Sequence, residues 1–114
     1  MLRTAHQIIT GLMIALGLIH VSVTFADYDT FSLGALWFAS AGVAIVLAGF
    51  LNVILLRDAG GRDKVVRLLC VFTNIIFAAM FGAALILMRQ PQIFVGLALF
   101  IIAAITSLTV NKAD

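Results

Sequence analysis

Four long runs of apolar residues dominate this chain of 114 residues. They cover approximately residues 7–25, 34–56, 66–88 and 93–110, and their interiors contain no Asp, Glu, Lys or Arg. A helix rises 1.5 Å per residue, so about 20 apolar residues cross the roughly 30 Å of hydrocarbon in a bilayer. In lipid every backbone group needs a partner within the segment, which a helix provides and an open sheet edge does not. The sequence therefore predicts an all-α membrane protein with four transmembrane helices.

The composition excludes a soluble domain. Such domains carry roughly a quarter charged and about half apolar residues, whereas here 11% are charged and 64% are hydrophobic. Water does not tolerate that much apolar side chain on a surface, but lipid does. We therefore expect the lipid bilayer to be the solvent for residues 1–114, which form a single transmembrane domain.

The connections between the runs are short and polar. They comprise residues 26–32, 57–64 and 89–92, and we interpret Gly60 and Gly61 as a helix stop followed by a turn. Short loops make sequential helices antiparallel neighbours. The expected architecture is an up-down bundle of four antiparallel helices.

The basic residues are distributed unequally between the two sides of such a bundle. One side carries six of them and the other only Arg89; the six are Arg3, Arg57, Arg62, Lys64, Arg67 and Lys112. By the positive-inside rule, both termini are predicted to be cytoplasmic, in a bacterial inner membrane. The net charge of +2 is spread over chain ends and loops, so it is no footprint for nucleic acid.

The first helix carries a stripe of polar and small residues. They recur at spacings of three and four, which places them on one side of the helix; they are His6, Thr10, Met13, Gly17, His20 and Thr24. We expect this stripe to face the other helices. At its depth in the membrane His20 needs a hydrogen-bond partner, for which Trp37 and Ser40 are candidates.

His20 is also the residue with the strongest functional alternative. The spacing of Leu16, His20 and Thr24 is like a permissive pattern found at quinone sites, and Leu-rich helices meet it by chance. His6 and His20 lie about 21 Å apart along a helix, too far to ligate one metal ion. The sequence predicts no metal site and no cofactor, and packing is the favoured role of His20.

Two asparagines are expected to meet in the third of the bundle nearest the termini. Asn52 precedes Arg57 by five residues, and Asn74 follows Arg67 by seven, so both amides lie at a similar depth. Thr10, Thr106 and Ser107 reach about the same level. An interhelical hydrogen bond in a membrane contributes on the order of 0.6 kcal/mol. We interpret this layer as packing contacts rather than a solute path.

Small residues recur on the helices at spacings that let backbones approach closely. The pairs and rows are Gly42 with Gly49, Ser40 with Ala44 and Ala48, Gly11 with Ala15, Ala78 with Gly82, and Ala103 with Ser107. There are more of them than one small bundle needs. This excess points to self-association or to a membrane-protein partner.

Catalytic, phosphate-binding and metal-binding motifs are absent from the sequence. We therefore expect a non-catalytic accessory or interaction subunit of a membrane complex. Two alternatives stay open: a homo-oligomeric channel or transporter for small solutes, and a quinone-linked membrane anchor using His20. Of the intramembrane polar residues, those on which any of these functions could rest are Thr10, His20, Ser40, Asn52, Asn74 and Thr106.

Overall fold

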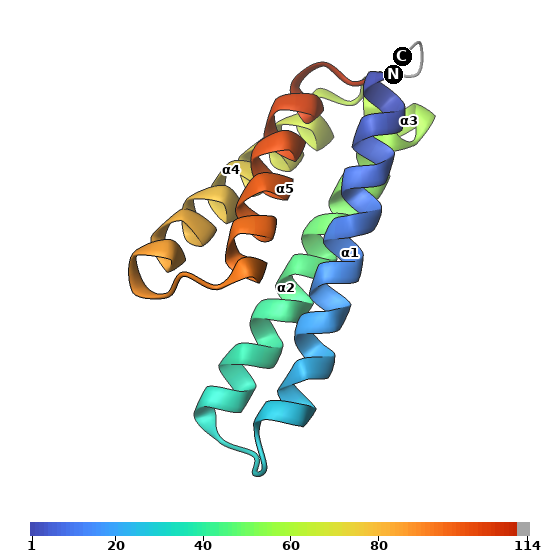
Figure 1. The fold of residues 1–114 in the computed structure, drawn as a ribbon. Helices are drawn as coiled ribbons and strands as arrows, with labels where there is room; N and C mark the ends of the chain where they lie inside the picture. Colours follow the sequence, from blue (N-terminus) through green and yellow to red (C-terminus); the bar gives the residue numbers. More distant parts are fainter. Residues whose placement is uncertain (112–114) are drawn as a thin grey trace.

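The computed structural model describes residues 1–111 and consists of helices joined by short connections (Figure 1). Four of them are long and apolar enough to cross a membrane. The helices of this described part are α1 (Leu2–Asp27), α2 (Leu33–Leu56), α3 (Asp58–Arg62), α4 (Lys64–Leu87) and α5 (Pro91–Thr109). The chain is thus a four-span integral membrane protein, as predicted. Lys112, which entered the charge count, lies outside the described residues.

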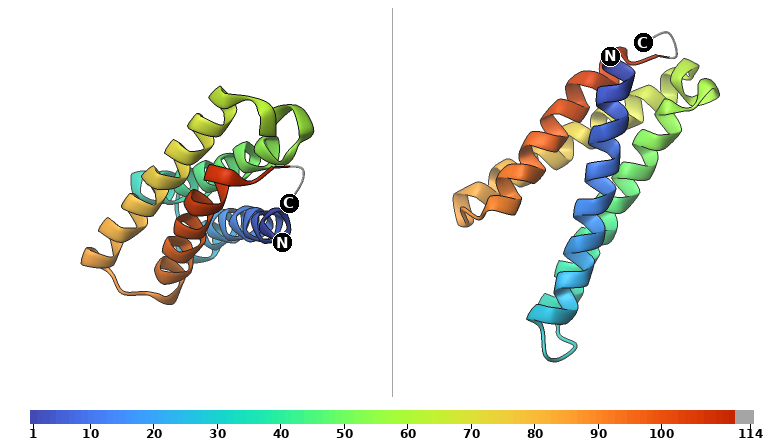
Figure 2. Two further views of the ribbon diagram at one scale, coloured as in Figure 1. Left: turned by 90° about the horizontal axis from the view of Figure 1, so that it is seen from above. Right: turned by 45° about the vertical axis from the view of Figure 1, so that its right-hand side comes forward.

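The long helices form two antiparallel hairpins that meet at one end. The main packing lies within the hairpin α1–α2 and within the hairpin α4–α5, with smaller contacts of α1 with α5 and of α2 with α4. Figures 1 and 2 show α4–α5 diverging from α1–α2 with distance from the end that holds the N-terminus and α3. We call that end the terminal end. The outer part of α1–α2, near its own loop, is therefore not covered by α4–α5.

Helices α1 and α2 approach closely because glycines face each other. A Cβ atom added to Gly17 would lie 2.8 Å from the carbonyl oxygen of Gly42, and one added to Gly42 would lie 2.9 Å from that of Gly17. Gly49 is in equally close contact with Ile14. Gly42 and Gly49, which are seven residues apart, thus allow the close helix packing that we expected. No Cβ fits at this crossing without moving a backbone.

Aromatic rings hold α4 against α5. Phe77 stacks on the ring of Phe100, with centroids 4.8 Å apart, and Phe81 lies 5.7 Å from it on the other side. Phe100 is fully buried. Gly96 makes room for the Phe81 ring, which a side chain at that position would displace. Pro91 is the first residue of α5, where its missing N–H removes no helical bond.

The connection between α2 and α4 contains the helix α3, which contradicts our interpretation of Gly60 and Gly61 as a helix stop and turn. Asp58 begins this helix and Arg62 ends it, an arrangement that suits the helix dipole. No glycine among residues 1–111 has a positive φ. Gly60 is needed for another reason: it is buried, and an added Cβ would overlap the carbonyl of Ile54. The glycine lets α3 fold back onto α2.

The polar and small stripe of α1 faces inward as predicted. Its members His6, Thr10, Met13, Gly17 and Thr24 are buried, while His20 is partly buried.

The small-residue rows divide into two groups. Ala103 and Ser107 are buried between helices. Gly11 and Ala15 are exposed to the surroundings of the bundle, and a Cβ added to Gly11 or to Gly82 would meet nothing within 4 Å. Gly11 and Gly82 therefore allow no close helix contact within the molecule, although Ala78, the other member of the row at Gly82, packs against the core.

Candidate functional site

A cluster of buried polar side chains lies near the terminal end, where the two hairpins meet. At its centre Asn52 of α2 and Asn74 of α4 exchange two hydrogen bonds. Asn52 Nδ2 donates to Asn74 Oδ1 at 2.9 Å, and Asn74 Nδ2 donates to Asn52 Oδ1 at 3.0 Å. Both residues are 0% exposed. The pairing across the hairpins that their depth suggested is therefore present.

Neighbouring groups use the remaining bonds of the two amides. Asn52 Nδ2 also donates to the carbonyl of Ala48 at 2.8 Å, and the Cys70 thiol donates to Asn52 Oδ1 at 3.1 Å. Asn74 Nδ2 reaches Ser107 Oγ of α5 at 3.4 Å. Three helices are thus joined by side chains alone. Cys70 is fully buried in this network, so it acts as a bonded packing residue.

Arg67 closes the cluster on the side of the termini. Its guanidinium donates to the carbonyls of Ser107 at 2.7 Å, Gly61 at 2.8 Å and Val110 at 2.7 Å. Two of these carbonyls belong to the C-terminal turn of α5 and the residue after it, where helices leave their carbonyls unsatisfied. Arg67 therefore caps α5 and ties it to α3 and α4.

On the opposite side, His6 of α1 bonds to Thr106 of α5, with His6 Nδ1 2.6 Å from Thr106 Oγ1. The Thr106 hydroxyl has one proton, which it donates to the carbonyl of Ile102 at 2.9 Å. His6 Nδ1 must then be the donor to Thr106, and in the neutral ring Nε2 carries the lone pair. Neither His6 Nε2 nor Thr10 Oγ1 has a hydrogen-bond partner within the protein. Since buried polar groups are normally bonded, these two atoms are exceptions within the cluster.

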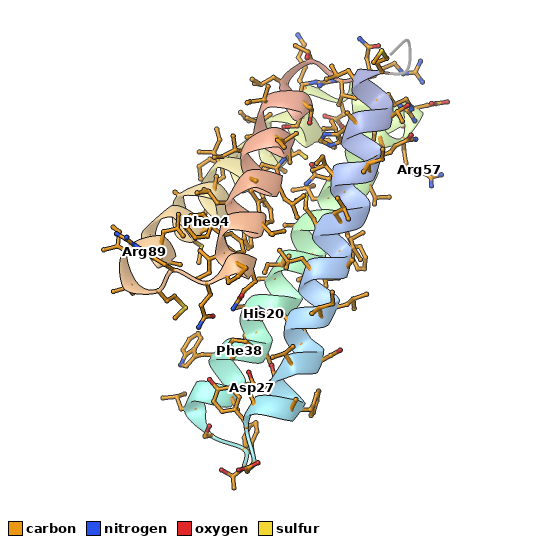
Figure 3. All side chains as sticks on the ribbon, in the orientation of Figure 1. His20, Asp27, Phe38, Arg57, Arg89 and Phe94 are labelled. Atoms are coloured by element: carbon orange, nitrogen blue, oxygen red, sulfur yellow. The ribbon has the colours of Figure 1, made fainter. Side chains whose placement is uncertain are left out.

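His20 lies outside this cluster, at the level where the α4–α5 hairpin ends, and Gln92 of α5 lines the same pocket (Figure 3). Its ring stacks on Phe38, with centroids 3.9 Å apart and planes at 17°. Our expectation of Trp37 or Ser40 as its partner is wrong, because both are exposed and His20 Nε2 has no hydrogen-bond partner. Phe38 is the residue next to Trp37, and its ring contacts the His20 ring in place of either predicted side chain.

The divergence of the hairpins leaves two hollows between them. We call the first the α2–α4 groove; its volume is about 320 Å³, and it is lined by Ala41, Ala44, Ile45, Phe77, Met80, Phe81 and Ala84. We call the second the His20 pocket; its volume is about 290 Å³, and it is lined by Leu16, Ile19, His20, Val23 and Gln92. The groove has no titratable or amide side chain, whereas the pocket has one imidazole and one amide.

Of the six intramembrane candidates, the structure brings Thr10, Asn52, Asn74 and Thr106 to the terminal end and leaves His20 and Ser40 apart. Four members of the cluster were not among the six candidates: His6, Arg67, Cys70 and Ser107. A signal for Arg67 was available, because it precedes Cys70 by three residues and Asn74 by seven and so shares their helix face. His6 is one turn from Thr10 on the polar stripe that was expected to face the other helices, and this position was the signal for its burial.

Among residues 1–111, no group of three or more His, Cys, Asp or Glu side chains is placed to hold a metal ion. In the comparisons with known proteins, no family model, no curated protein and no solved structure matches the chain.

Proposed function

We propose that this protein is a non-catalytic accessory subunit of a membrane complex, and that it binds one transmembrane helix of another protein in the α2–α4 groove. The observation that supports this most is the divergence of the hairpins, which leaves the small residues of α2 without a helix against them. We place the protein in a bacterial inner membrane with cytoplasmic termini. Figure 3 supports the orientation, since Arg57 lies at the terminal end and Arg89 at the tip of α4–α5.

The lining of the groove suits a helix. Ala44 belongs to the row Ser40, Ala44 and Ala48, of which Ala48 is buried under the crossing hairpins while Ser40 is exposed. The row is thus buried between helices at Ala48 and lines the open groove at Ala44. Helices in lipid associate through close backbone approach at small residues, because burial of apolar surface gives no drive there. Phe77, Met80 and Phe81 form the opposite wall, and aromatic and Met side chains adapt to a partner's shape.

The polar residues favour this function over a channel or transporter. A solute path needs polar groups along the span, but the polar groups of the cluster lie at one end, where all except His6 Nε2 and Thr10 Oγ1 are hydrogen-bonded. Toward the other end, the groove between the hairpins is lined by alanine and larger apolar residues. The cluster therefore supports a role in fixing the helices in register.

The test is to fill the groove. Ala44→Leu adds a branched side chain to its floor, and Gly11→Leu is the matched control, since a Cβ at Gly11 points into open space. Each tagged variant is extracted gently at native expression, and the native mass of the complex is measured. We expect a partner at fixed ratio with the wild type and with Gly11→Leu, and its loss with Ala44→Leu.

Two other outcomes are decisive. A homodimer that Ala44→Leu dissociates would make the occupant a second copy and move the function toward the homo-oligomeric alternative. A wild-type monomer without any partner protein would contradict the proposal.

The His20 pocket favours a second candidate function, a quinone-linked membrane anchor. His20 Nε2 is a buried ring nitrogen without a protein partner, in a pocket that also contains the Gln92 amide. A quinone carbonyl accepts hydrogen bonds from such groups. Organic extraction of the purified protein, followed by an absorption spectrum, tests this. Quinone retained by the wild type and lost in His20→Leu, but kept in the control Ser22→Ala, would support it; protein without quinone would rule it out.

A further inference from the structure

A small pocket at the terminal end is lined by three arginines from three different parts of the fold. Its volume is about 160 Å³, and its lining consists of Arg3, Arg57, Asp58, Gly61, Arg62 and Asn111. We call it the arginine pocket. Arg3 comes from the first turn of α1, Arg57 from the link between α2 and α3, and Arg62 from the end of α3. The fold, rather than a run of basic sequence, gathers these charges.

The charge of the pocket fits an anion. The lining contains three guanidinium groups and one carboxylate, that of Asp58, so its net charge is +2. Arg3 is partly held in place, since its guanidinium donates to the carbonyl of Leu56 at the end of α2. A guanidinium has five N–H donors in a planar fork that matches phosphate oxygens, so this bond leaves Arg3 with donors for a second partner. The volume equals that of about five water molecules, enough for a phosphate group.

The depth of the pocket points to lipid. Arg3 follows the first residue of α1, and Arg57 follows the last residue of α2, so both lie where membrane-spanning helices end. That is the level of the phospholipid headgroups. Basic pockets between helices at this level bind anionic headgroups. A neighbouring hollow of about 470 Å³ shares Arg3, Arg57 and Asp58 and is lined also by Leu56 and Ala59, so apolar surface adjoins the charged part.

We propose that the arginine pocket binds the phosphate group of an anionic phospholipid. The glycerol side of the headgroup then lies toward Leu56 and Ala59, and the phosphate oxygens lie among Arg3, Arg57 and Arg62. A free phosphate ion offers the same chemistry without the acyl chains. The proposal does not depend on the function proposed above, because the groove and this pocket share no residue.

The experiment compares the wild type with Arg57→Gln/Arg62→Gln. Both side chains are exposed, so the double variant keeps the fold. The control is Arg89→Gln, which removes one positive charge at the opposite loop. Each protein, in neutral detergent, is offered equal amounts of phosphatidylglycerol and phosphatidylcholine, and bound lipid is counted by native mass spectrometry. The wild type is expected to prefer phosphatidylglycerol, since a choline group brings a positive charge to the arginines. Each arginine removed lowers this preference about fivefold.

A second measurement separates the two sources of phosphate. Inorganic phosphate without lipid is compared with sodium chloride of equal ionic strength, and the thermal unfolding temperature is recorded. Stabilisation of the wild type by the ion, absent in the double variant, would identify free phosphate and overturn the lipid assignment. Equal binding of the two lipids by the wild type would overturn the proposal, as would an equal loss of preference in Arg89→Gln and the double variant.

Discussion

The paired amides of Asn52 and Asn74 allow a prediction that can be worked out from their bonds. Asn52→Leu keeps the size of the side chain but removes both hydrogen bonds of the amide pair and the bond from the Cys70 thiol, and it leaves Asn74 Oδ1 buried without a donor. Leaving one buried partner unsatisfied costs about 1–3 kcal/mol, so we expect each of Asn52→Leu and Asn74→Leu to lower the free energy of unfolding by about 2 kcal/mol. Two interhelical bonds at about 0.6 kcal/mol each give a coupling of about 1.2 kcal/mol. The double variant should therefore lose less than the two single variants together, by about that amount.

The assay is unfolding by SDS in mixed micelles, followed by energy transfer between labels on the α1–α2 and α4–α5 loops. Thr24→Val combined with Asn52→Leu is the control pair, because Thr24 bonds only within its own helix, to the carbonyl of His20 at 3.2 Å. Distant sites without shared partners are additive within about 0.5 kcal/mol. Additive effects of the two asparagine variants would refute the direct amide pair.

Three further predictions follow from other contacts. Gly17→Ala should destabilise the protein by about 1–3 kcal/mol, because its Cβ would lie 2.9 Å from a backbone nitrogen of α2, while Gly11→Ala should leave the SDS midpoint unchanged or higher; equal effects would contradict the tight crossing. Arg67→Gln should speed hydrogen exchange in the last turn of α5, where two carbonyl bonds are lost, and unchanged exchange rates would show that the cap is dispensable. A cysteine replacing Asp29, in the α1–α2 loop, should react with a membrane-impermeant maleimide added to intact cells; labelling only after lysis would reverse the proposed orientation.

The sequence predicted the architecture well because it is governed by length and polarity. The four runs became four helices, with α1 beginning at Leu2 and α5 at Pro91, before the apolar runs themselves begin. The short helix α3 was missed, because a pair of glycines is a frequent helix stop. Here Gly60 is required by a close approach to Ile54, a tertiary contact that local sequence does not contain.

The candidate site was predictable where depth alone decides contact. Counting residues from the loop brought Asn52 and Asn74 to one level, and the structure pairs them. The contacts between particular side chains also depend on the rotation of each helix about its axis and on the crossing angle. The sequence does not predict these two quantities, so it did not predict those contacts. Ser40 lies at a depth similar to that of His20, but it is on a face of α2 that points away from the His20 ring. Phe38 stacks on the His20 ring instead. Arg67 was read only as a charge for orientation, since its use as a helix cap needs the end of α5 beside it.

The divergence of the two hairpins also gives the molecule unequal cross-sections in the two leaflets. Near the termini the helices lie together, and toward the loops they occupy a wider outline (Figure 2). A wedge of this kind displaces more lipid from one leaflet than from the other. Lateral pressure in the wider leaflet would act to close the hairpins, and membrane curvature that relieves this pressure would let them open. The bonds that join the hairpins are concentrated in the polar cluster, which makes it the pivot about which such a change of angle turns.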